Sequence, residues 1–185
     1  MHEKEDYYYI DQTLSGDTEA YRWLVDKYKD HSLRLAFQIL KNIEDAEDVV
    51  QDSFVKAFGS LKKFKKEAAF STWLYRIVYN MSIDRTRKKK VQTVDIQQAS
   101  SVSTEDTGTI DPKGELELLK KAMNELANDE SLIIQLHYLE GKDMKEIGHI
   151  VGSSHAAVRK KISRVRIKLR NDLEKILGKE TLKLS

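Results

Sequence analysis

The residues best suited to recognise another molecule are the cations that follow Ser154. At roughly 100° per residue, a helix that begins there gathers polar and basic side chains on its outward face. Guanidinium and ammonium groups in such a position can donate hydrogen bonds to guanine O6 and N7 in the major groove of DNA. The candidates for this noncovalent chemistry are Arg159, Lys160, Ser163 and Arg164.

A helix-turn-helix is expected to position these side chains. Asp143 can cap a short apolar helix, Gly152-Ser153 forms the turn, and Ser154 can cap the second helix. Arg166 lies to the side of the outward face, so we expect it to contact phosphate rather than a base. A basic helix alone is usually a solvated surface, but the turn and the two caps favour DNA binding here.

A second candidate surface belongs to a helix expected from about Glu44. One stripe of this helix is apolar and should face a core. That stripe contains Ala46, Val50, Ala57 and Leu61. The opposite face contains Glu44, Asp48, Gln51, Asp52 and Val55. Such a face is either a solvated acidic surface with one exposed valine or a docking surface for a basic protein partner.

A third candidate surface combines aromatic rings with cations, on a helix expected from near Ser71. The residues expected to face inward are Phe70, Leu74, Ile77 and Met81, and those on the outer half are Thr72, Tyr75, Arg76, Tyr79 and Ile83. Further cations flank the helix at 62–66 and 85–90. Because bases stack on rings while cations follow phosphates, this combination suits a separated strand. The alternative is that Tyr75 and Tyr79 pack against another helix and that the lysines only aid solubility.

The composition favours a helical protein made of two small units. The 185 residues include one proline and eight glycines, and no segment alternates apolar and polar residues as an amphipathic strand would. Residues 91–112 lack helical periodicity and are predicted to form a flexible linker. The predicted fold is therefore all-α, with helical domains at 1–90 and 113–185, the second containing the helix-turn-helix.

The expected helices follow from candidate caps and apolar periodicity. In the first domain, Asp17 caps a helix that ends near Leu40, Asn42 caps a second, and the third begins near Ser71. In the second domain, helices are expected at about 114–126, 129–140, 143–151 and 154–177.

The net charge of +2 conceals a segregation of charge along the chain. Acids gather at 44–52, whereas bases gather at 85–90 and 159–170. This pattern predicts separate surfaces for different partners.

Several classes of function are disfavoured. The chain has no cysteine, and its five histidines lack the paired spacing of a metal site. No GxxxxGK phosphate-binding motif and no recognisable Ser/His/Asp arrangement occurs, so we expect no enzyme, cofactor or metal. No apolar run approaches the roughly 18 residues of a membrane span, and no signal-peptide pattern opens the chain. We therefore expect a cytoplasmic protein without membrane insertion.

These residues together resemble a known group, the extracytoplasmic-function (ECF) class of bacterial RNA polymerase sigma factors within the sigma-70 family. The similarity covers Gly16-Asp17, Asn42–Ala57, Phe70–Ile77 and the helix-turn-helix. Asn42–Ala57 looks like the polymerase-binding segment of the family, and Phe70–Ile77 is similar to the segment that handles the minus-ten promoter element.

The resemblance implies a factor that directs RNA polymerase to specific promoters and assists promoter melting in transcription initiation, without catalysis of its own. The implied contacts with core polymerase are Asp48, Val49, Gln51, Asp52 and Val55. The implied contacts with the melted minus-ten element are Phe64, Lys65, Phe70, Ser71, Trp73, Tyr75, Arg76, Tyr79, Asn80 and Arg87. The implied contacts with the duplex minus-thirty-five element are Ser154, Arg159, Lys160, Ser163, Arg164 and Arg166. A cognate anti-sigma factor is a further implied partner.

Two departures from the family pattern fall in the helix-turn-helix. Ala156-Ala157 replaces a frequent glycine-threonine pair and so removes a hydroxyl that can reach a phosphate. Gly148 replaces a usual alanine, at a cost of about 1 kcal/mol in helix propensity. The first departure leaves the preferred promoter sequence open.

Two other functions fit parts of the sequence. One is a duplex-binding repressor or activator that uses only the C-terminal motif, with the first domain serving dimerisation or sensing. It leaves Val55 and Tyr79 unexplained. The other is a protein-binding helical module whose basic helices meet acidic proteins.

Overall fold

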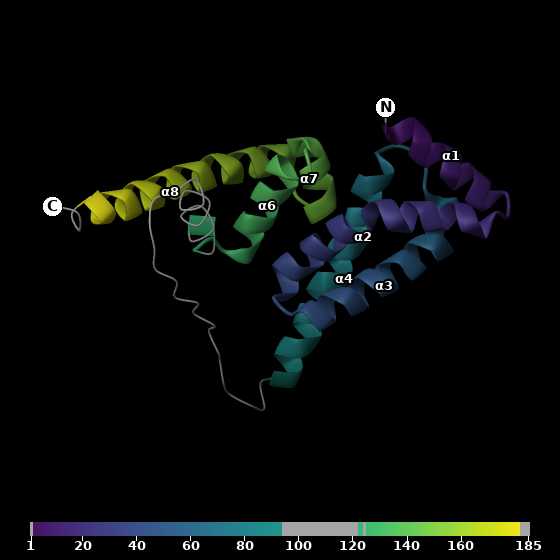
Figure 1. The fold of residues 1–185 in the computed structure, drawn as a ribbon, viewed down its shortest axis with the longest axis horizontal. Helices are drawn as coiled ribbons and strands as arrows, with labels where there is room; N and C mark the ends of the chain where they lie inside the picture. The colour runs from purple at the N-terminus through teal and green to yellow at the C-terminus, as the bar shows by residue number, and fades with distance from the viewer. Residues whose placement is uncertain (1, 94–121, 124, 182–185) are drawn as a thin grey trace.

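The computed structural model describes residues 2–93, 122–123 and 125–181. Within these ranges the protein contains helices and no strand, which confirms the predicted all-α class. The helices are α1 (His2–Leu14), α2 (Thr18–Leu40), α3 (Ile43–Ser60), η1 (Leu61–Lys63), α4 (Phe70–Thr93), α6 (Asn128–Tyr138), α7 (Met144–Val151) and α8 (His155–Thr181). Figure 1 shows α1–α4 gathered as one unit and α6–α8 as another; we call them the N-terminal and the C-terminal unit.

The core of the N-terminal unit lies between α2, α3 and α4, which all pack against one another. The apolar stripe predicted on α3 is confirmed, because Ala46, Val50, Ala57 and Leu61 are all buried. From α4, Phe70 and Leu74 are fully buried in the same core. The burial of these apolar faces is the main force that holds the three helices together.

The predicted helix starts in this unit are also confirmed. The Asp17 carboxylate accepts hydrogen bonds from the backbone N–H groups of Glu19 and Ala20, at 3.1 and 3.3 Å. The Asn42 side chain accepts one from the N–H of Asp45, at 2.8 Å. These bonds satisfy donors that a helix N-terminus leaves unpaired, so they fix where α2 and α3 begin.

Helix α1 was not predicted, and it packs along α2. Its inward face mixes apolar and polar side chains: Ile10 is 1% exposed and Asp6 is 2% exposed. The Asp6 carboxylate accepts a 2.6 Å hydrogen bond from the Tyr28 hydroxyl and pairs with Lys27. Burial, followed by this bond to Asp6, raises the pKa of Tyr28, so its hydroxyl stays protonated and donates.

Helix α4 runs to Thr93 and so includes the first three residues of the linker predicted to start at residue 91. The helix therefore continues through the first residues that were expected to be irregular. The remainder of the predicted linker, 94–112, lies outside the described residues. So does most of the helix expected at 114–126.

The helix-turn-helix forms as predicted. The Asp143 carboxylate accepts hydrogen bonds from the N–H groups of Glu146 and Lys145, which lower the pKa of Asp143. Gly152 ends α7 in the left-handed region, at φ 67°, and the Ser154 hydroxyl accepts a 3.2 Å bond from the N–H of Ala157 at the start of α8. Among the α8 residues whose side chains the structure describes, the buried stripe consists of Val158, Ile162 and Val165.

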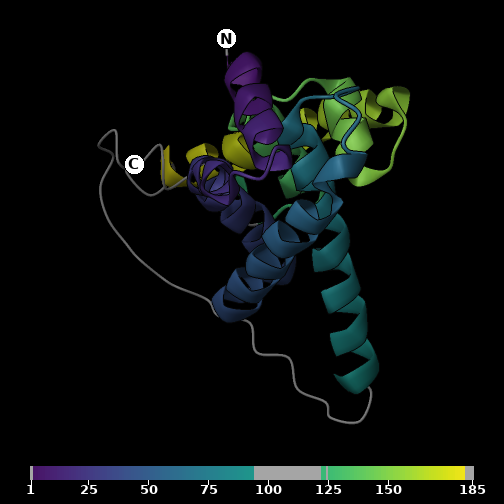
Figure 2. The same cartoon turned by 90° about the vertical axis from the view of Figure 1, so that its right-hand side faces the viewer.

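The two units pack directly against each other. Helix α7 lies against α4, and α6 lies against α2. Figure 2 shows the same cartoon turned by 90°, with the C-terminal unit next to the upper part of α4, where α7 contacts it. Buried residues of both units, including Leu35, Tyr75 and Leu136, belong to one apolar cluster. The flexible linker expected from the sequence left this placement open.

Gly148 lies where α7 and the turn after it approach most closely. A Cβ atom added at Gly148 would lie 2.6 Å from the backbone carbonyl oxygen of Ser153. The same turn is closed by a 2.8 Å hydrogen bond from the Ser153 N–H to the Gly148 carbonyl. The absence of a side chain therefore allows the tight turn, which accounts for the glycine at this position.

We expect Gly148→Ala to lower the thermal unfolding midpoint. The added Cβ clashes with the backbone, and the shift that removes the clash costs about 1–3 kcal/mol. This cost is larger than the free energy that alanine gains over glycine in helix propensity. The matched control is Gly59→Ala in α3, where an added Cβ meets nothing within 4 Å. That control should raise the midpoint, since alanine favours a helix by up to about 1 kcal/mol. Circular dichroism during heating measures both. A rise for both variants would contradict the steric explanation.

Candidate polymerase and nucleic-acid interfaces

The outward face of α3 is an acidic surface with an apolar centre. Val55 is 68% exposed, and Gln51 and Asp52 beside it are exposed. Val49, which the family resemblance implied as a contact with core polymerase, is 4% exposed and lies in the core. The structure does not fit that expectation for Val49, because its side chain lies on the buried side of the helix.

The acids of α3 and the bases of α4 are not separate surfaces. The Arg85 guanidinium lies 2.7 Å from the Asp48 carboxylate and 3.3 Å from that of Asp45. Lys89 pairs with Asp45 as well. The segregation of charge along the sequence therefore serves in part to join α3 to α4. Asp48 nevertheless keeps 66% of its side chain exposed and can still face a partner.

Val55 and Phe58 border an apolar groove of about 640 Å³ between α2 and α3. Phe58 is 44% exposed, although it is a large aromatic residue. No pattern in the sequence indicated this residue or the α2 side of the groove. The residues that line the groove are Tyr21, Val25, Lys29, Asp30, Leu33, Glu47, Val50, Gln51, Phe54, Val55 and Phe58.

The segment between η1 and α4 presents the predicted aromatic and basic residues. The Phe64 ring lies 5.2 Å from Trp73 and 5.8 Å from Phe70, centroid to centroid. Lys65 is exposed next to it. Lys66 adopts a left-handed backbone, at φ 57°, and its ammonium pairs with Asp11 of α1 at 2.8 Å. Helix α1 thus helps to hold this segment in place.

The outer face of α4 is largely covered rather than solvated. Thr72 is 0% exposed and Tyr75 is 2% exposed, and both lie against the C-terminal unit. For Tyr75, the alternative that it packs against another helix is therefore correct in this structure. The other α4 residues predicted to contact the minus-ten element differ in exposure. The buried ones are Phe70 and Ser71, the half-buried ones are Trp73 and Tyr79, and the exposed ones are Arg76, Asn80 and Arg87.

Two carboxylates of the C-terminal unit hold the covered face. The Thr72 hydroxyl donates a 2.6 Å hydrogen bond to Glu146, and the Tyr75 hydroxyl donates one of 3.3 Å to Glu140. Burial, and then the Glu140 charge, raise the pKa of Tyr75, which keeps this donor protonated. Neither glutamate was a candidate from sequence, because no local pattern indicates which residues meet between two domains.

The basic face of α8 is open to solvent. All six residues predicted to contact the minus-thirty-five element are exposed, namely Ser154, Arg159, Lys160, Ser163, Arg164 and Arg166. They stand on a helix whose opposite side is buried in the C-terminal unit. This arrangement leaves the first turns of α8 free to enter a major groove.

Other kinds of site find no support in the part of the chain that the structure describes. No group of histidine, aspartate or glutamate residues there is arranged to hold a metal ion. Among the same residues, no helix is both long and apolar enough to cross a membrane.

Comparison with known proteins follows the same division of the chain. The family described as Sigma-70 region 2 matches residues 24–91, and Sigma-70, region 4 matches residues 116–169. The chain is 32% identical over 176 residues to the ECF RNA polymerase sigma factor SigW of Bacillus subtilis, covering 89% of this chain and 94% of that protein. The chain belongs to the ECF sigma factors. It therefore directs RNA polymerase to promoters in transcription initiation, and its partners include core RNA polymerase and promoter DNA.

Other relatives and solved structures agree with this membership. The ECF RNA polymerase sigma-E factor of Haemophilus influenzae is 29% identical over 181 residues, covering 91% of this chain and 95% of that protein. The structure of CnrH with the cytosolic domain of CnrY is similar with a TM-score of 0.66 and 26% identity, covering 92% of this chain and 97% of CnrH. The sigma factor RpoE of Bartonella quintana was solved with the anti-sigma factor NepR. It is similar to this chain with a TM-score of 0.65 and 25% identity, and the match covers 83% of this chain and 96% of RpoE.

We expect the same substitution to have effects of very different size at two valines of α3. Val49→Ala should lower the free energy of unfolding by about 2 kcal/mol, because it removes buried methyl groups and leaves a cavity. Val55→Ala should change it by less than about 0.5 kcal/mol, as is usual for an exposed site. Urea denaturation measures both values. Equal losses would show that Val55 is part of the core and would remove it from the docking face.

Proposed function

We propose that this sigma factor uses three separate surfaces during initiation. The acidic face of α3 docks on core RNA polymerase. The outer face of α4, with the segment before it, binds the melted strand of the minus-ten element and so assists promoter melting. The first turns of α8 read the duplex minus-thirty-five element. The region 2-like domain would span residues 1–93 and the region 4-like domain 113–185, with the linker between them.

The observation that carries this proposal is the two-sided character of α8. Val158 and Ile162 are 1% and 3% exposed, whereas Arg159 and Lys160 between them project into solvent. A helix anchored by one side presents its opposite side at a fixed angle. Positioning of this kind supports base readout, in which arginine donates two hydrogen bonds to guanine.

The α3 face supports polymerase docking for a different reason. Val55 and Phe58 are exposed apolar side chains at an apolar groove, and the exposed carboxylate of Asp52 lies beside them. Such an apolar centre within a charged rim is typical of protein interfaces, where burial of the centre supplies affinity and the rim supplies steering.

The α4 surface supports binding of a separated strand. Phe64 and Trp73 present aromatic rings on which bases can stack, and Lys65, Arg76 and Arg87 supply cations for phosphates. The covering of Tyr75 by the C-terminal unit implies that full use of this surface requires the two units to separate.

We also propose that the protein acts in the cytoplasm without catalysing a reaction, and that a cognate anti-sigma factor holds it inactive. RpoE, which is similar over 83% of this chain, was solved with an anti-sigma factor. An ECF sigma factor performs its role by binding polymerase and promoter, for which no catalytic group is needed.

Transcription from a promoter library tests the whole proposal. Purified protein is added to core RNA polymerase, and the 5′ ends of the transcripts are sequenced. We expect start sites that depend on the protein and share two upstream elements. Absence of specific initiation with every bacterial core enzyme tried would overturn the proposal. Activity that needs only the minus-thirty-five element would favour a duplex-binding activator instead.

For the docking face, we expect Asp52→Lys combined with Val55→Ser to weaken binding to core polymerase by about 2 kcal/mol, or roughly thirtyfold in Kd. The lysine repels a basic partner, and the serine removes the apolar anchor. Fluorescence anisotropy with labelled protein measures the affinity in the absence of DNA. The control Glu174→Lys makes the same charge change on exposed α8 and should bind normally. Unaltered binding by the double variant would exclude this face.

For α8, we expect Arg159→Ala in the holoenzyme to relax preference at one base pair of the upstream element, by about 1–3 kcal/mol. Arg166→Ala should instead weaken all promoters equally, because a phosphate contact carries no sequence information. Transcription from the library measures both profiles. A uniform loss with Arg159→Ala would reassign this residue to the phosphate backbone.

A further inference from the structure

The face of α4 proposed to bind a melted strand is occupied by the chain's own C-terminal unit. Thr72 and Tyr75 have less than 3% of their surface exposed, and both donate hydrogen bonds across the boundary between the units. Strand binding to these residues and their contacts with α6 and α7 are therefore mutually exclusive.

Glu140 supplies the first group of contacts. Its side chain is only 3% exposed, at the turn after α6. The carboxylate contacts the His31 ring nitrogen, accepts a 3.3 Å hydrogen bond from Arg34, and accepts another from Tyr75. All three partners belong to the N-terminal unit. A buried carboxylate is stable only when such donors surround it, so its position depends on this docking.

Glu146 supplies the second group, one helix away. It accepts the bond from Thr72 and lies 3.4 Å from the ammonium of Lys142, which itself donates a 2.6 Å bond to Ser71. The neighbouring Arg76 guanidinium donates a 3.1 Å bond to the backbone carbonyl of His149. On the outer face of α4, Thr72, Tyr75 and Arg76 thus direct their donors at oxygen atoms of the C-terminal unit, whereas Ser71 accepts a hydrogen bond from that unit.

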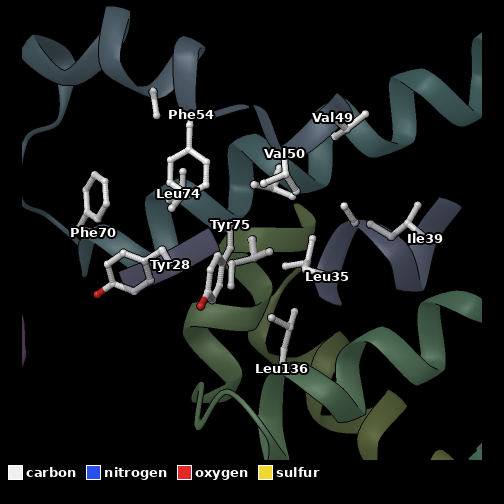
Figure 3. Packing of buried hydrophobic residues seen from close by; sticks show 14 of the residues in the cluster. Tyr28, Leu35, Ile39, Val49, Val50, Phe54, Phe70, Leu74, Tyr75 and Leu136 are labelled. Carbon is white, nitrogen blue, oxygen red and sulfur yellow. The ribbon is translucent and has the colours of Figure 1, made fainter. Parts of the chain in front are cut away.

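Apolar contacts lie beside these polar ones. Figure 3 shows Leu136 of α6 pointing toward Leu35 and Tyr75 of the N-terminal unit. All three side chains are at most 2% exposed. The boundary therefore resembles a docked interface with a small apolar centre and a ring of charge-assisted hydrogen bonds. Domains joined through such mixed surfaces commonly separate and re-dock.

The oxygen atoms that occupy this face have the chemistry of a nucleic-acid backbone. Hydroxyl, guanidinium and imidazole groups that hold carboxylates also bind phosphate oxygens. We infer that Glu140 and Glu146 form a latch, by which the C-terminal unit occupies the strand-binding face of α4 in place of the melted strand. This inference rests on the strand-binding role proposed above for α4.

The latch has a selective consequence. The cations of α8 are exposed in the latched chain, whereas Thr72 and Tyr75 of α4 are covered. Release of the latch should therefore raise affinity for a single strand and leave affinity for a duplex unchanged. The apparent affinity for the strand falls in proportion to the fraction of molecules that are open.

The test removes both charges without changing side-chain size, by Glu140→Gln with Glu146→Gln in the full chain. The matched control is Glu125→Gln with Glu174→Gln, which removes two charges from exposed positions of the same unit. Because the chain has no cysteine, the pair Thr18→Cys and Asn171→Cys can carry fluorescent labels, one on each unit. Energy transfer between them reports the separation of the units, and circular dichroism verifies folding.

Binding is measured with labelled DNA of random sequence, once as a single strand and once as a duplex. For the latch variant we expect reduced energy transfer before DNA is added, and strand affinity increased by about fivefold or more, within the range usual for coupled sites. Duplex affinity should be unchanged, and the control variant should match the wild type in all three measurements.

Two results would overturn the latch. Unchanged energy transfer in the latch variant would show that the glutamates do not hold the units together. Equal gains for strand and duplex, or gains in the control, would show that a general loss of negative charge is responsible. A third result concerns the proposed function. If energy transfer falls in the variant, but neither the variant nor the wild type binds single-stranded DNA, then α4 does not bind a strand. In that case the latch cannot control strand binding either. The α3 and α8 assignments are tested separately by their own variants.

Discussion

The Glu140 carboxylate is almost completely buried, yet the groups that neutralise it come from α2 and α4 in the other half of the chain. A charge removed from water costs several kcal/mol unless it is paired and hydrogen-bonded. This requirement links the positions of α2, α4 and α6 to one another. It also places Tyr75 beneath the C-terminal unit, so the accessibility of the α4 surface depends on whether Glu140 keeps its partners.

Features that depend on neighbouring residues were predictable from the sequence. Asp17, Asn42, Asp143 and Ser154 all cap helices as expected, because a cap involves a side chain and backbone two or three residues away. The apolar stripe of α3 and the exposed basic face of α8 followed from helical spacing alone. Helix α1 escaped detection because its inward face includes Asp6 and Thr13, so its hydrophobic periodicity is weak.

Features that depend on distant residues were not predictable. The pairing of Arg85 with Asp48 joins residues 37 positions apart, and the bond between Thr72 and Glu146 joins residues 74 apart. Each charged run looked like a free surface when considered by itself. The outer face of α4 was predicted either to bind a separated strand or to pack against another helix. In this structure Thr72 and Tyr75 of that face are buried against the protein's own second domain, a contact that no local pattern in the sequence indicates. Val49 was expected to contact polymerase because it lies within Asn42–Ala57, the segment that resembles the family's polymerase-binding segment. A continuous stretch of helix includes residues of both its exposed and its buried side, and Val49 is on the buried side.

The placement of the three surfaces limits how a closed chain can be opened. A ligand shifts a conformational equilibrium only by the difference in its affinity for the two states. Helix α3 packs against α2, α4 and η1, and its exposed acidic face at Val55 is available whether or not α6 and α7 cover α4. Docking of polymerase on that face alone would therefore bind both states equally and open neither. If the latch proposed above holds, opening must draw its free energy from contacts that only the separated units can make, such as those of a strand that replaces Glu140 and Glu146 on α4.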